Sequence, residues 1–245
     1  MESAVVAFSG GVDSALLVVL AHAELGNRMV AVMGVSASVP ERDRLLATSF
    51  CTSRKIPFVE MDTKEFEDPR YLKNPANRCF FCKQTLFRTL LSFADENNFQ
   101  YILEGTNASD LKGHRPGYAA KEESDRILSP LVDAGFTKDD VRQLARDLTL
   151  EVAEKPQSAC LSSRIEIHLP IDPGVLKKID SAENTLRDLG LQQVRVRFHR
   201  DHVRIEVGTQ EIEQAFSKRH IILEKLTALG WNNISLDLAG YASKK

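Results

Sequence analysis

The sequence predicts an α/β protein with a parallel, doubly wound sheet, followed by a small α+β domain. Short apolar runs alternate with helix-like patterns along the first part of the chain, and a glycine-rich turn follows the first run. Such alternation is typical of a parallel sheet covered by helices on both faces. After Arg164 the order changes to helix, strand, strand, helix, strand. We therefore expect domains at 1–165 and 170–240.

The strands of the first domain are expected as apolar runs, and its helices as segments with helical spacing. Pro40 suits a helix start. Thr137, with Asp140 three residues on, has the pattern of a helix N-cap. The segment 107–124 is polar and rich in turn residues, which predicts an irregular loop. The expected strands are 4–8, 29–35, 58–61 and 101–104, and the expected helices are 15–21, 40–55, 83–97 and 137–150.

The second domain is predicted from a hairpin pattern between two helices. Residues 193–199 and 202–207 alternate in polarity and are separated by two residues, which is typical of a β-hairpin. A helix is expected at 175–189 before the hairpin and another at 211–229 after it. Residues 233–238 could add a last strand.

Composition excludes several classes of protein. The chain has 245 residues, of which 43% are hydrophobic, so it can bury a proper core. A net charge of −2 predicts no general nucleic-acid partner. No apolar run approaches the roughly 20 residues of a membrane span, and no signal peptide is visible, so we expect a cytoplasmic protein without a membrane partner. Its four cysteines are then expected to be metal-binding or reactive rather than disulfide-bonded.

The loop from Ser9 to Ser14, Ser-Gly-Gly-Val-Asp-Ser, is the first candidate site. It lies between a strand and a helix. Its glycines allow a sharp turn with N–H groups facing an anion, its serines add hydroxyl donors, and the helix directs its positive end at the same place. The loop matches neither a Walker A nor a G-x-G-x-x-G sequence. The pattern predicts a phosphate cradle.

The cysteines form the second candidate site. Cys79 and Cys82 have Cys-x-x-Cys spacing just before an expected helix, whose N-terminus favours thiolates. A zinc site would need two further ligands, and a redox pair usually follows a first strand. Cys160 lies among hydroxyl residues before Arg164. Three cysteines could hold three irons of a cubane cluster and leave the fourth iron open. Cys51 is expected to be buried packing.

The glycine-rich loop resembles that of the PP-loop ATP pyrophosphatases, whose fold is adenine nucleotide α-hydrolase-like. Further motifs resemble the LarE family of ATP-dependent sulfur-inserting enzymes, over roughly positions 3 to 238. These motifs are Asn77-Arg78-Cys79 with Cys82-Lys83, Glu104-Gly105-Thr106-Asn107, Asp110, Arg115-Pro116-Gly117, Ser129-Pro130-Leu131, Lys155-Pro156, Ala159-Cys160-Leu161, Ser163-Arg164-Ile165, Arg195-Val196-Arg197 and Arg204-Ile205-Glu206.

The resemblance implies ATP and Mg²⁺ at the loop and a nucleotide, pyridinium-3,5-biscarboxylic acid mononucleotide, as substrate. A substrate carboxylate would attack the α-phosphorus, and sulfur would then displace AMP, toward the nickel-pincer nucleotide of lactate racemase. Asp13 would also bind the metal, and Asp110 could complete its surroundings. The implied phosphate-binding residues are Ser9, Gly10, Gly11, Asp13, Ser14, Gly105 and Thr106.

The substrate carries its own phosphate, for which the resemblance implies a clamp. Arg195 and Arg197 alternate on a strand and so project from one face, and guanidinium groups suit phosphate. Glu183 and Glu206 are candidates for orienting these arginines or for acting on protons, and Glu183 is our candidate catalytic carboxylate. The implied clamp consists of Ser163, Arg164, Arg195 and Arg197.

The sulfur source stays open between two mechanisms. One branch of the family sacrifices the cysteine that corresponds to Cys160 and leaves dehydroalanine. Cys79 and Cys82 depart from the sacrificial pattern and favour a [4Fe-4S] cluster on Cys79, Cys82 and Cys160, with sulfide as donor. A tRNA thiolase or an ammonia-using PP-loop synthetase is the alternative class. Family members often form hexamers, so we expect a homo-oligomer.

Overall fold

The computed structural model describes residues 1–112, 118–156 and 158–241. The chain divides into two compact units. The first comprises Met1–Tyr71 and Ala76–Ser158, and the second comprises Leu72–Pro75 and Ala159–Lys245. The segment that carries Cys160 and Arg164 thus belongs to the second unit, although the sequence analysis places it in a first domain ending at 165. Within the second unit, Arg164 of this segment forms an ion pair with Glu183.

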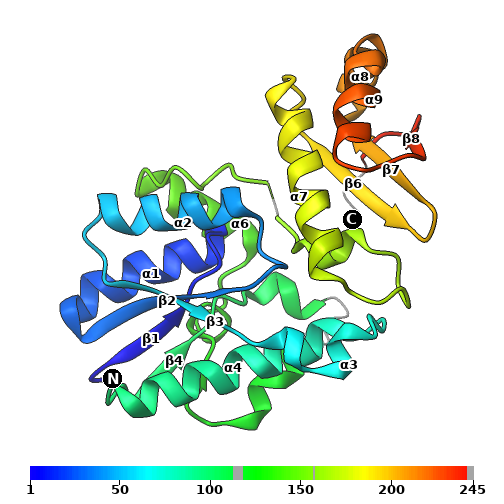
Figure 1. The fold of residues 1–245 in the computed structure, drawn as a ribbon. Coiled ribbons are helices and arrows are strands. Elements are labelled where there is room, and N and C mark those ends of the chain that lie inside the picture. The colour runs from blue at the N-terminus through cyan, green and yellow to red at the C-terminus, as the bar shows by residue number, and fades with distance from the viewer. Residues whose placement is uncertain (113–117, 157, 242–245) are drawn as a thin grey trace. The chain divides into compact units, whose positions relative to one another are not determined.

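The first unit is built on a parallel sheet of five strands in the order β3-β2-β1-β4-β5. The parallel α/β fold predicted from the alternating pattern is therefore confirmed (Figure 1). The two-residue strand β5 was not predicted, because it is too short to show a period. The strands are β1 (Ala4–Ala7), β2 (Met29–Val35), β3 (Phe58–Asp62), β4 (Tyr101–Leu103) and β5 (Ile127–Leu128).

Helices cover both faces of this sheet. Successive side chains of a strand point to opposite faces, and here both sets are apolar. Along β1, Ala4 and Val6 pack with α1, α2 and α6 on one face, and Val5 packs with α4 on the other. Figure 1 shows these helices on the two sides of the strands. The helices are α1 (Val12–Leu25), α2 (Glu41–Ser53), α3 (Pro69–Leu72), α4 (Arg78–Glu96), α5 (Pro130–Asp133) and α6 (Lys138–Asp147).

Helix α4 begins five residues earlier than expected, at Arg78 rather than at 83. Cys79 and Cys82 therefore lie within the first turns of the helix and not before it. The turn is closed by Phe80 N, which donates to Asn77 O at 2.9 Å, and it is covered by Arg70, whose guanidinium lies 4.8 Å from the centre of the Phe81 ring. The adjacent aromatic residues Phe80 and Phe81 have no helical spacing, so the sequence pattern did not reveal where the helix begins.

Several short 3₁₀ helices connect the elements. Part of the expected irregular segment 107–124 is ordered in this way, and Arg115-Pro116-Gly117 of that segment lies outside the described residues. These helices are η1 (Gly26–Arg28), η2 (Glu65–Glu67), η3 (Ala108–Lys112), η4 (Tyr118–Glu123), η5 (Leu161–Arg164) and η6 (Thr209–Glu211).

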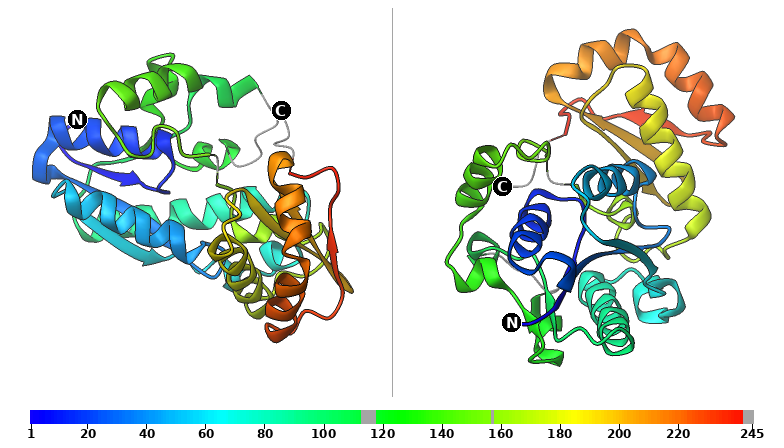
Figure 2. Two further views of the ribbon diagram at one scale, coloured as in Figure 1. Left: turned by 90° about the horizontal axis from the view of Figure 1, so that it is seen from above. Right: turned by 90° about the vertical axis from the view of Figure 1, so that its left-hand side faces the viewer.

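The second unit has a three-stranded sheet in the order β6-β7-β8, with an antiparallel hairpin and a parallel third strand. The predicted hairpin is confirmed, with His199 opposite His202 at its end. The single expected helix at 211–229 is interrupted at Lys218. Helix α7 packs along β6 (Figures 1 and 2). The elements are α7 (Pro173–Asp188), β6 (Val194–His199), β7 (His202–Val207), α8 (Ile212–Ser217), α9 (Arg219–Ala228) and β8 (Ile234–Leu236).

A membrane span would need a long apolar helix. None of the helices within the described ranges has the length and apolar character to cross a bilayer.

Candidate functional site

The loop between β1 and α1 is held in shape by its own serines. Gly10 has a φ of +70°, a left-handed conformation that L side chains rarely adopt. Ser14 Oγ donates to Gly11 O at 3.0 Å and accepts from Ser9 N at 3.2 Å. Helix α1 starts at Val12 with Gly11 as its N-cap and without a side-chain cap. Its first N–H groups are therefore available to an anion.

A second loop, after β4, closes tightly against this one. A Cβ atom added to Gly105 would lie 3.0 Å from the backbone N of Ser14, so no larger residue fits without movement. The next residue, Thr106, donates its hydroxyl to Glu104 Oε2 at 2.6 Å. The carboxyl ends of the neighbouring strands β1 and β4 thus bring residues 9–14 and 105–106 together. This is the edge where doubly wound sheets bind ligands.

Two lysines that the sequence analysis missed lie on the loop. Lys138 Nζ is 2.5 Å from Asp13 Oδ2, and Lys155 Nζ donates to Gly10 O at 3.0 Å. Asn107 Nδ2 donates to the other oxygen of Asp13 at 3.0 Å. Lys155 was quoted only as part of a motif, and Lys138 carried one signal: a lysine directly after the N-cap, where acidic residues are preferred. Asp110 exchanges bonds with Asn107 within its own loop.

The loop fits the triphosphate of ATP. Glycine conformation, free helix N–H groups and two ammonium groups within contact of the loop atoms all favour a polyanion. The carboxylate of Asp13 is an oxygen ligand of the kind that Mg²⁺ prefers. The residues therefore suit a magnesium nucleotide.

Glu104 joins the β4 end to helix α4. Its carboxylate is 3% exposed and accepts from Lys83 Nζ at 2.9 Å, as well as from Thr106 and Ser129. Burial disfavours the charged form, but Lys83 and the hydroxyl bonds outweigh it and lower the pKa of Glu104. A buried anion therefore holds the cysteine-bearing helix next to the loop at 105–106.

The cysteines are distributed over the two units. Cys79 is exposed and Cys82 half-buried, both at the start of α4 in the first unit, while Cys160 is half-buried in the second. Cys79 and Cys82 are three residues apart and so lie on one side of the helix. Burial raises the pKa of the Cys51 thiol to about 12, as expected for a packing residue. Within the described ranges, no three His, Cys, Asp or Glu side chains are grouped to hold a metal ion.

Cys79 and Cys82 supply two of the three thiols that the expected cluster would need. Thiols on one face of a helix are donors of the kind that iron–sulfur centres use. Cys79 and Cys82 fit this donor set.

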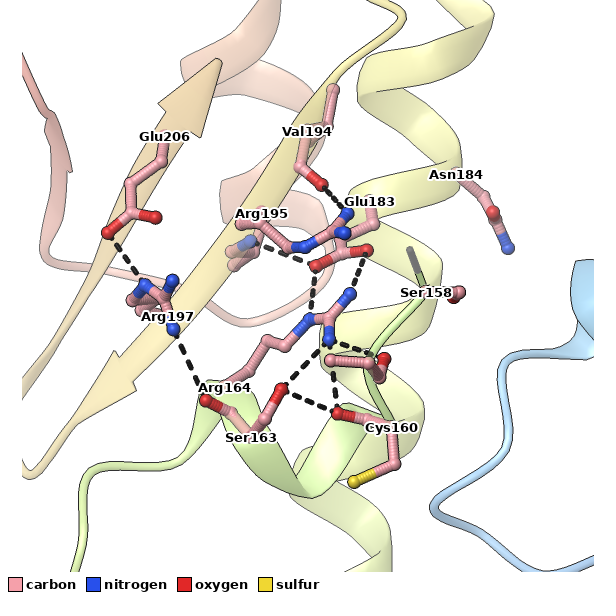
Figure 3. Close-up of polar contacts among 12 residues, drawn as sticks. Ser158, Cys160, Ser163, Arg164, Glu183, Asn184, Val194, Arg195, Arg197 and Glu206 are labelled. Atoms are coloured by element: carbon pink, nitrogen blue, oxygen red, sulfur yellow. Dashed lines mark hydrogen bonds and ion pairs between the residues drawn. The ribbon is translucent and has the colours of Figure 1, made fainter. Parts of the chain in front are cut away.

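Arg164 is enclosed within the second unit. Its side chain is 2% exposed and its donors are already used. Nε and Nη2 donate to Glu183, and Nη1 donates to Ala159 O at 2.6 Å and to Cys160 O at 3.0 Å (Figure 3). Ser163 Oγ also donates to Cys160 O, at 2.7 Å. Arg164 and Ser163 therefore fix the backbone around Cys160.

Glu183 is the centre of this network. The carboxylate, 1% exposed, accepts from Arg164, from Arg187 Nη2 at 2.9 Å and from the backbone N of Val196 at 3.1 Å. Burial raises its pKa, but Arg164, through its charge and its hydrogen bond, and then Arg187 outweigh that effect and lower the pKa. Glu183 is thus a buried anion that orients the arginines around it. Arg187, four residues after Glu183, was not predicted.

Arg195 and Arg197 lie on β6 with a spacing of two, as predicted (Figure 3). Arg197 donates from Nε to Glu206 at 2.6 Å and from Nη1 to Ser163 O at 3.2 Å. Arg195 donates to Val194 O, and its guanidinium lies 5.0 Å from the centre of the Tyr241 ring. Burial, followed by the positive charge of Arg164, lowers the pKa of Arg195.

The arginines around Glu183 carry more positive charge than this one carboxylate neutralises. Arg164, Arg187 and Arg195 surround one carboxylate, that of Glu183. Crowded guanidinium groups repel one another, and a bound anion would relieve the repulsion. The arrangement suits a phosphate or carboxylate ligand within the second unit.

Comparison with known proteins gives full-length matches. No family model matches the chain. An uncharacterized protein of Synechocystis is 36% identical, over the whole of this chain and 92% of that protein. The pyridinium-3,5-bisthiocarboxylic acid mononucleotide synthase of Lactiplantibacillus plantarum is 29% identical, over 99% of this chain and 88% of the synthase.

A more distant group matches only part of the chain. One component of the glutamine-hydrolyzing GMP synthase of Archaeoglobus fulgidus is 26% identical, over 62% of this chain and 53% of that component. The full-length matches define a narrow family. The partial matches define a wider superfamily that shares only part of the chain.

Proposed function

The chain belongs to the LarE family of the PP-loop ATP pyrophosphatase superfamily, and we propose that it is an ATP-dependent sulfurtransferase acting on pyridinium-3,5-biscarboxylic acid mononucleotide. The observation that carries this proposal is the full-length similarity to the Lactiplantibacillus plantarum synthase of the bisthiocarboxylic acid mononucleotide. The product would serve biosynthesis of the nickel-pincer nucleotide.

The first step would be adenylation. A carboxylate oxygen of the substrate attacks the α-phosphorus of ATP, the bond to the bridging oxygen of the β-phosphate breaks, and pyrophosphate leaves. Residues 9–14 would bind the phosphates through the N–H groups of α1, with Gly105 and Thr106 beside them. Asp13 would ligate Mg²⁺. A carboxylate needs this step because AMP, unlike oxide, is a good leaving group.

The second step would be sulfur transfer in place of AMP. We assign the substrate's phosphate to Arg195 and Arg197, with Arg164, Ser163 and Glu183 holding the Cys160 segment and the arginines in position. A [4Fe-4S] cluster, when bound by Cys79, Cys82 and Cys160, would supply sulfide as the sulfur donor. The alternative is attack of the Cys160 thiolate on the adenylate, followed by Cβ–S cleavage that leaves dehydroalanine.

Iron content separates the two sulfur sources. We expect anaerobically purified protein to contain iron and sulfide, to show cluster absorbance, and to lose repeated turnover in Cys79→Ala. Cys51→Ala is the matched control, because Cys51 is a packing residue. An iron-free protein whose Cys160 loses its sulfur after one turnover would establish the sacrificial mechanism instead.

Nucleotide and substrate binding test the assignment of the two phosphate sites. Arg195→Ala and Arg197→Ala should weaken binding of the mononucleotide at least tenfold and leave the Kd for ATP unchanged. Arg219→Ala is the control, since Arg219 is exposed on α9 of the same unit. A loss of ATP affinity in the Arg195 or Arg197 variant would contradict the assignment, and a wild-type protein that forms no pyrophosphate with this substrate would contradict the reaction itself.

Two functions of the same superfamily are less well supported. A tRNA thiolase needs a wide basic surface, which a net charge of −2 does not favour. An ammonia-using synthetase is suggested by the similarity to GMP synthases, but these match only 60–63% of the chain. Homo-oligomer formation stays part of the proposal.

A further inference from the structure

Lys138 contacts the loop at residues 9–14, and the sequence did not predict this contact. Its ammonium lies 2.5 Å from Asp13 Oδ2, and Asn107 Nδ2 lies 3.0 Å from Oδ1. Asp13 is in the first turn of α1, next to Ser14. A cation therefore already neutralises the carboxylate that we assign to Mg²⁺.

The location of Lys138 on its helix is electrostatically unfavourable. It is the first residue of α6, where the helix dipole favours anions. Its backbone is nonetheless held firmly: Thr137 and Asp140 form a capping box, and Lys138 N donates to Ser109 Oγ at 3.0 Å. A lysine with the wrong sign for the helix end, on a rigid backbone and aimed at the loop, indicates a ligand-directed role.

The Asp13–Lys138 ion pair is also partly open to solvent, so a ligand can replace either partner. The side chain of Lys138 is 34% exposed and that of Asp13 is 22% exposed. Lys155 differs, because it is 16% exposed, pairs with Asp43 and also donates to Gly10 O, so it supports the loop from within. Of these two lysines, Lys138 is the more exposed, and its flexible four-carbon stem allows the ammonium to move.

We propose that Lys138 is a further ATP-phosphate residue, which neutralises Asp13 until a magnesium nucleotide binds and then moves onto a phosphate oxygen. The inference rests on the proposed ATP chemistry. Mg²⁺ and an ammonium cannot share the Asp13 carboxylate without repulsion. Transfer of the ammonium to the incoming phosphates leaves the carboxylate to Mg²⁺ and places both cations on anions.

The test is a double-mutant cycle on ATP binding. Dissociation constants for ATP are measured by calorimetry in EDTA, with wild type, Lys138→Met, Asp13→Asn and the double variant. A second set of titrations contains Mg²⁺. Lys177→Met, an exposed lysine on α7, is the matched control, and thermal melting shows that each variant is folded.

We expect Lys138→Met to weaken metal-free ATP binding at least tenfold, both in the wild type and in the Asp13→Asn background, because the ammonium itself contacts phosphate. Asp13→Asn alone should lose the tightening by Mg²⁺ but keep metal-free binding. Lys177→Met should bind as wild type.

Two results would overturn the inference. If Lys138→Met costs no affinity once Asp13 is replaced by Asn, Lys138 is only a counter-ion of Asp13, and the proposed reaction is untouched. If the wild type fails to bind ATP with or without Mg²⁺, both the inference and the proposed reaction fail.

Discussion

Arg164 shows at the scale of single residues how burial decides what a charged side chain does. In the sequence, Arg164 directly follows Ser162 and Ser163 near Cys160, and this pattern predicts an anion ligand. In the structure its side chain is 2% exposed and bonded to Glu183, Ala159 O and Cys160 O. A buried guanidinium needs all its donors satisfied, so it supports the Cys160 segment from behind.

Removing Arg164 should destabilise the second unit. We expect Arg164→Met to lower the free energy of unfolding by about 3–5 kcal/mol, because Glu183 is left as an incompletely paired buried charge. Arg164→Met combined with Glu183→Met should unfold with a smaller loss than the single variant, since neither charge then remains. Chemical denaturation measures both, and Arg219→Met is the exposed control. Equal losses in the exposed and buried variants would contradict this account.

The lowered pKa of Glu183 predicts how stability depends on pH. Because the folded pKa lies below the unfolded value of roughly 4.3, the ion pair stabilises the folded state fully above that pH and loses its contribution as the pH falls through the folded pKa. The fluorescence of Trp231, the only tryptophan and 7% exposed, reports this unit. Urea titrations should show a steeper loss of stability below about pH 4.3 in wild type than in Glu183→Gln, and equal slopes would exclude Glu183 as the cause.

Local interactions dominate at the scale of the elements. The capping box of α6 was predicted from Thr137 and Asp140 alone and is confirmed, with Asp140 N donating to Thr137 Oγ1 and Thr137 N donating to Asp140 Oδ2 at 2.9 Å. The hairpin of β6 and β7 and the strand β2 also match their predictions. Residues close in sequence control these features, so the sequence pattern is sufficient.

Loss of the cap should weaken α6 measurably. Thr137→Ala removes the acceptor for Asp140 N and should lower the free energy of unfolding by about 0.5–2 kcal/mol. Thr227→Ala on α9 is the matched control: this exposed threonine lies inside a helix, where alanine is the better helix former. Circular dichroism during urea titration measures both. A Thr137→Ala variant as stable as Thr227→Ala would mean that the box contributes nothing.

Two elements depended on contacts beyond their own sequence. Helix α4 begins at Arg78 because its first turn packs through Phe80 and Phe81 and is tied to the sheet by Lys83 and Glu104. The two-residue strand β5 exists only by pairing with β4. Neither the aromatic turn nor a two-residue strand has a period that a sequence pattern can reveal.

The proposed cluster makes a prediction about the whole molecule. Its proposed ligands are Cys79, Cys82 and Cys160. A cluster bound by the three thiolates would stabilise only the folded chain, so the iron-loaded protein should melt at a higher Tm than the iron-free protein. Cys79→Ser should lose this increase. Cys51→Ser, although buried, should keep the iron-dependent increase even if its absolute Tm falls.

The sequence by itself determined the parallel sheet, the glycine-rich loop, the N-cap of α6 and the hairpin, because each depends on spacing, backbone conformation or neighbours along the chain. Only the tertiary structure decided which charges meet: Lys138 with Asp13, Lys155 with Gly10, and Glu183 with both Arg164 and Arg187. Most of these partners are far apart in sequence, and their roles follow from burial, which a residue type alone does not reveal.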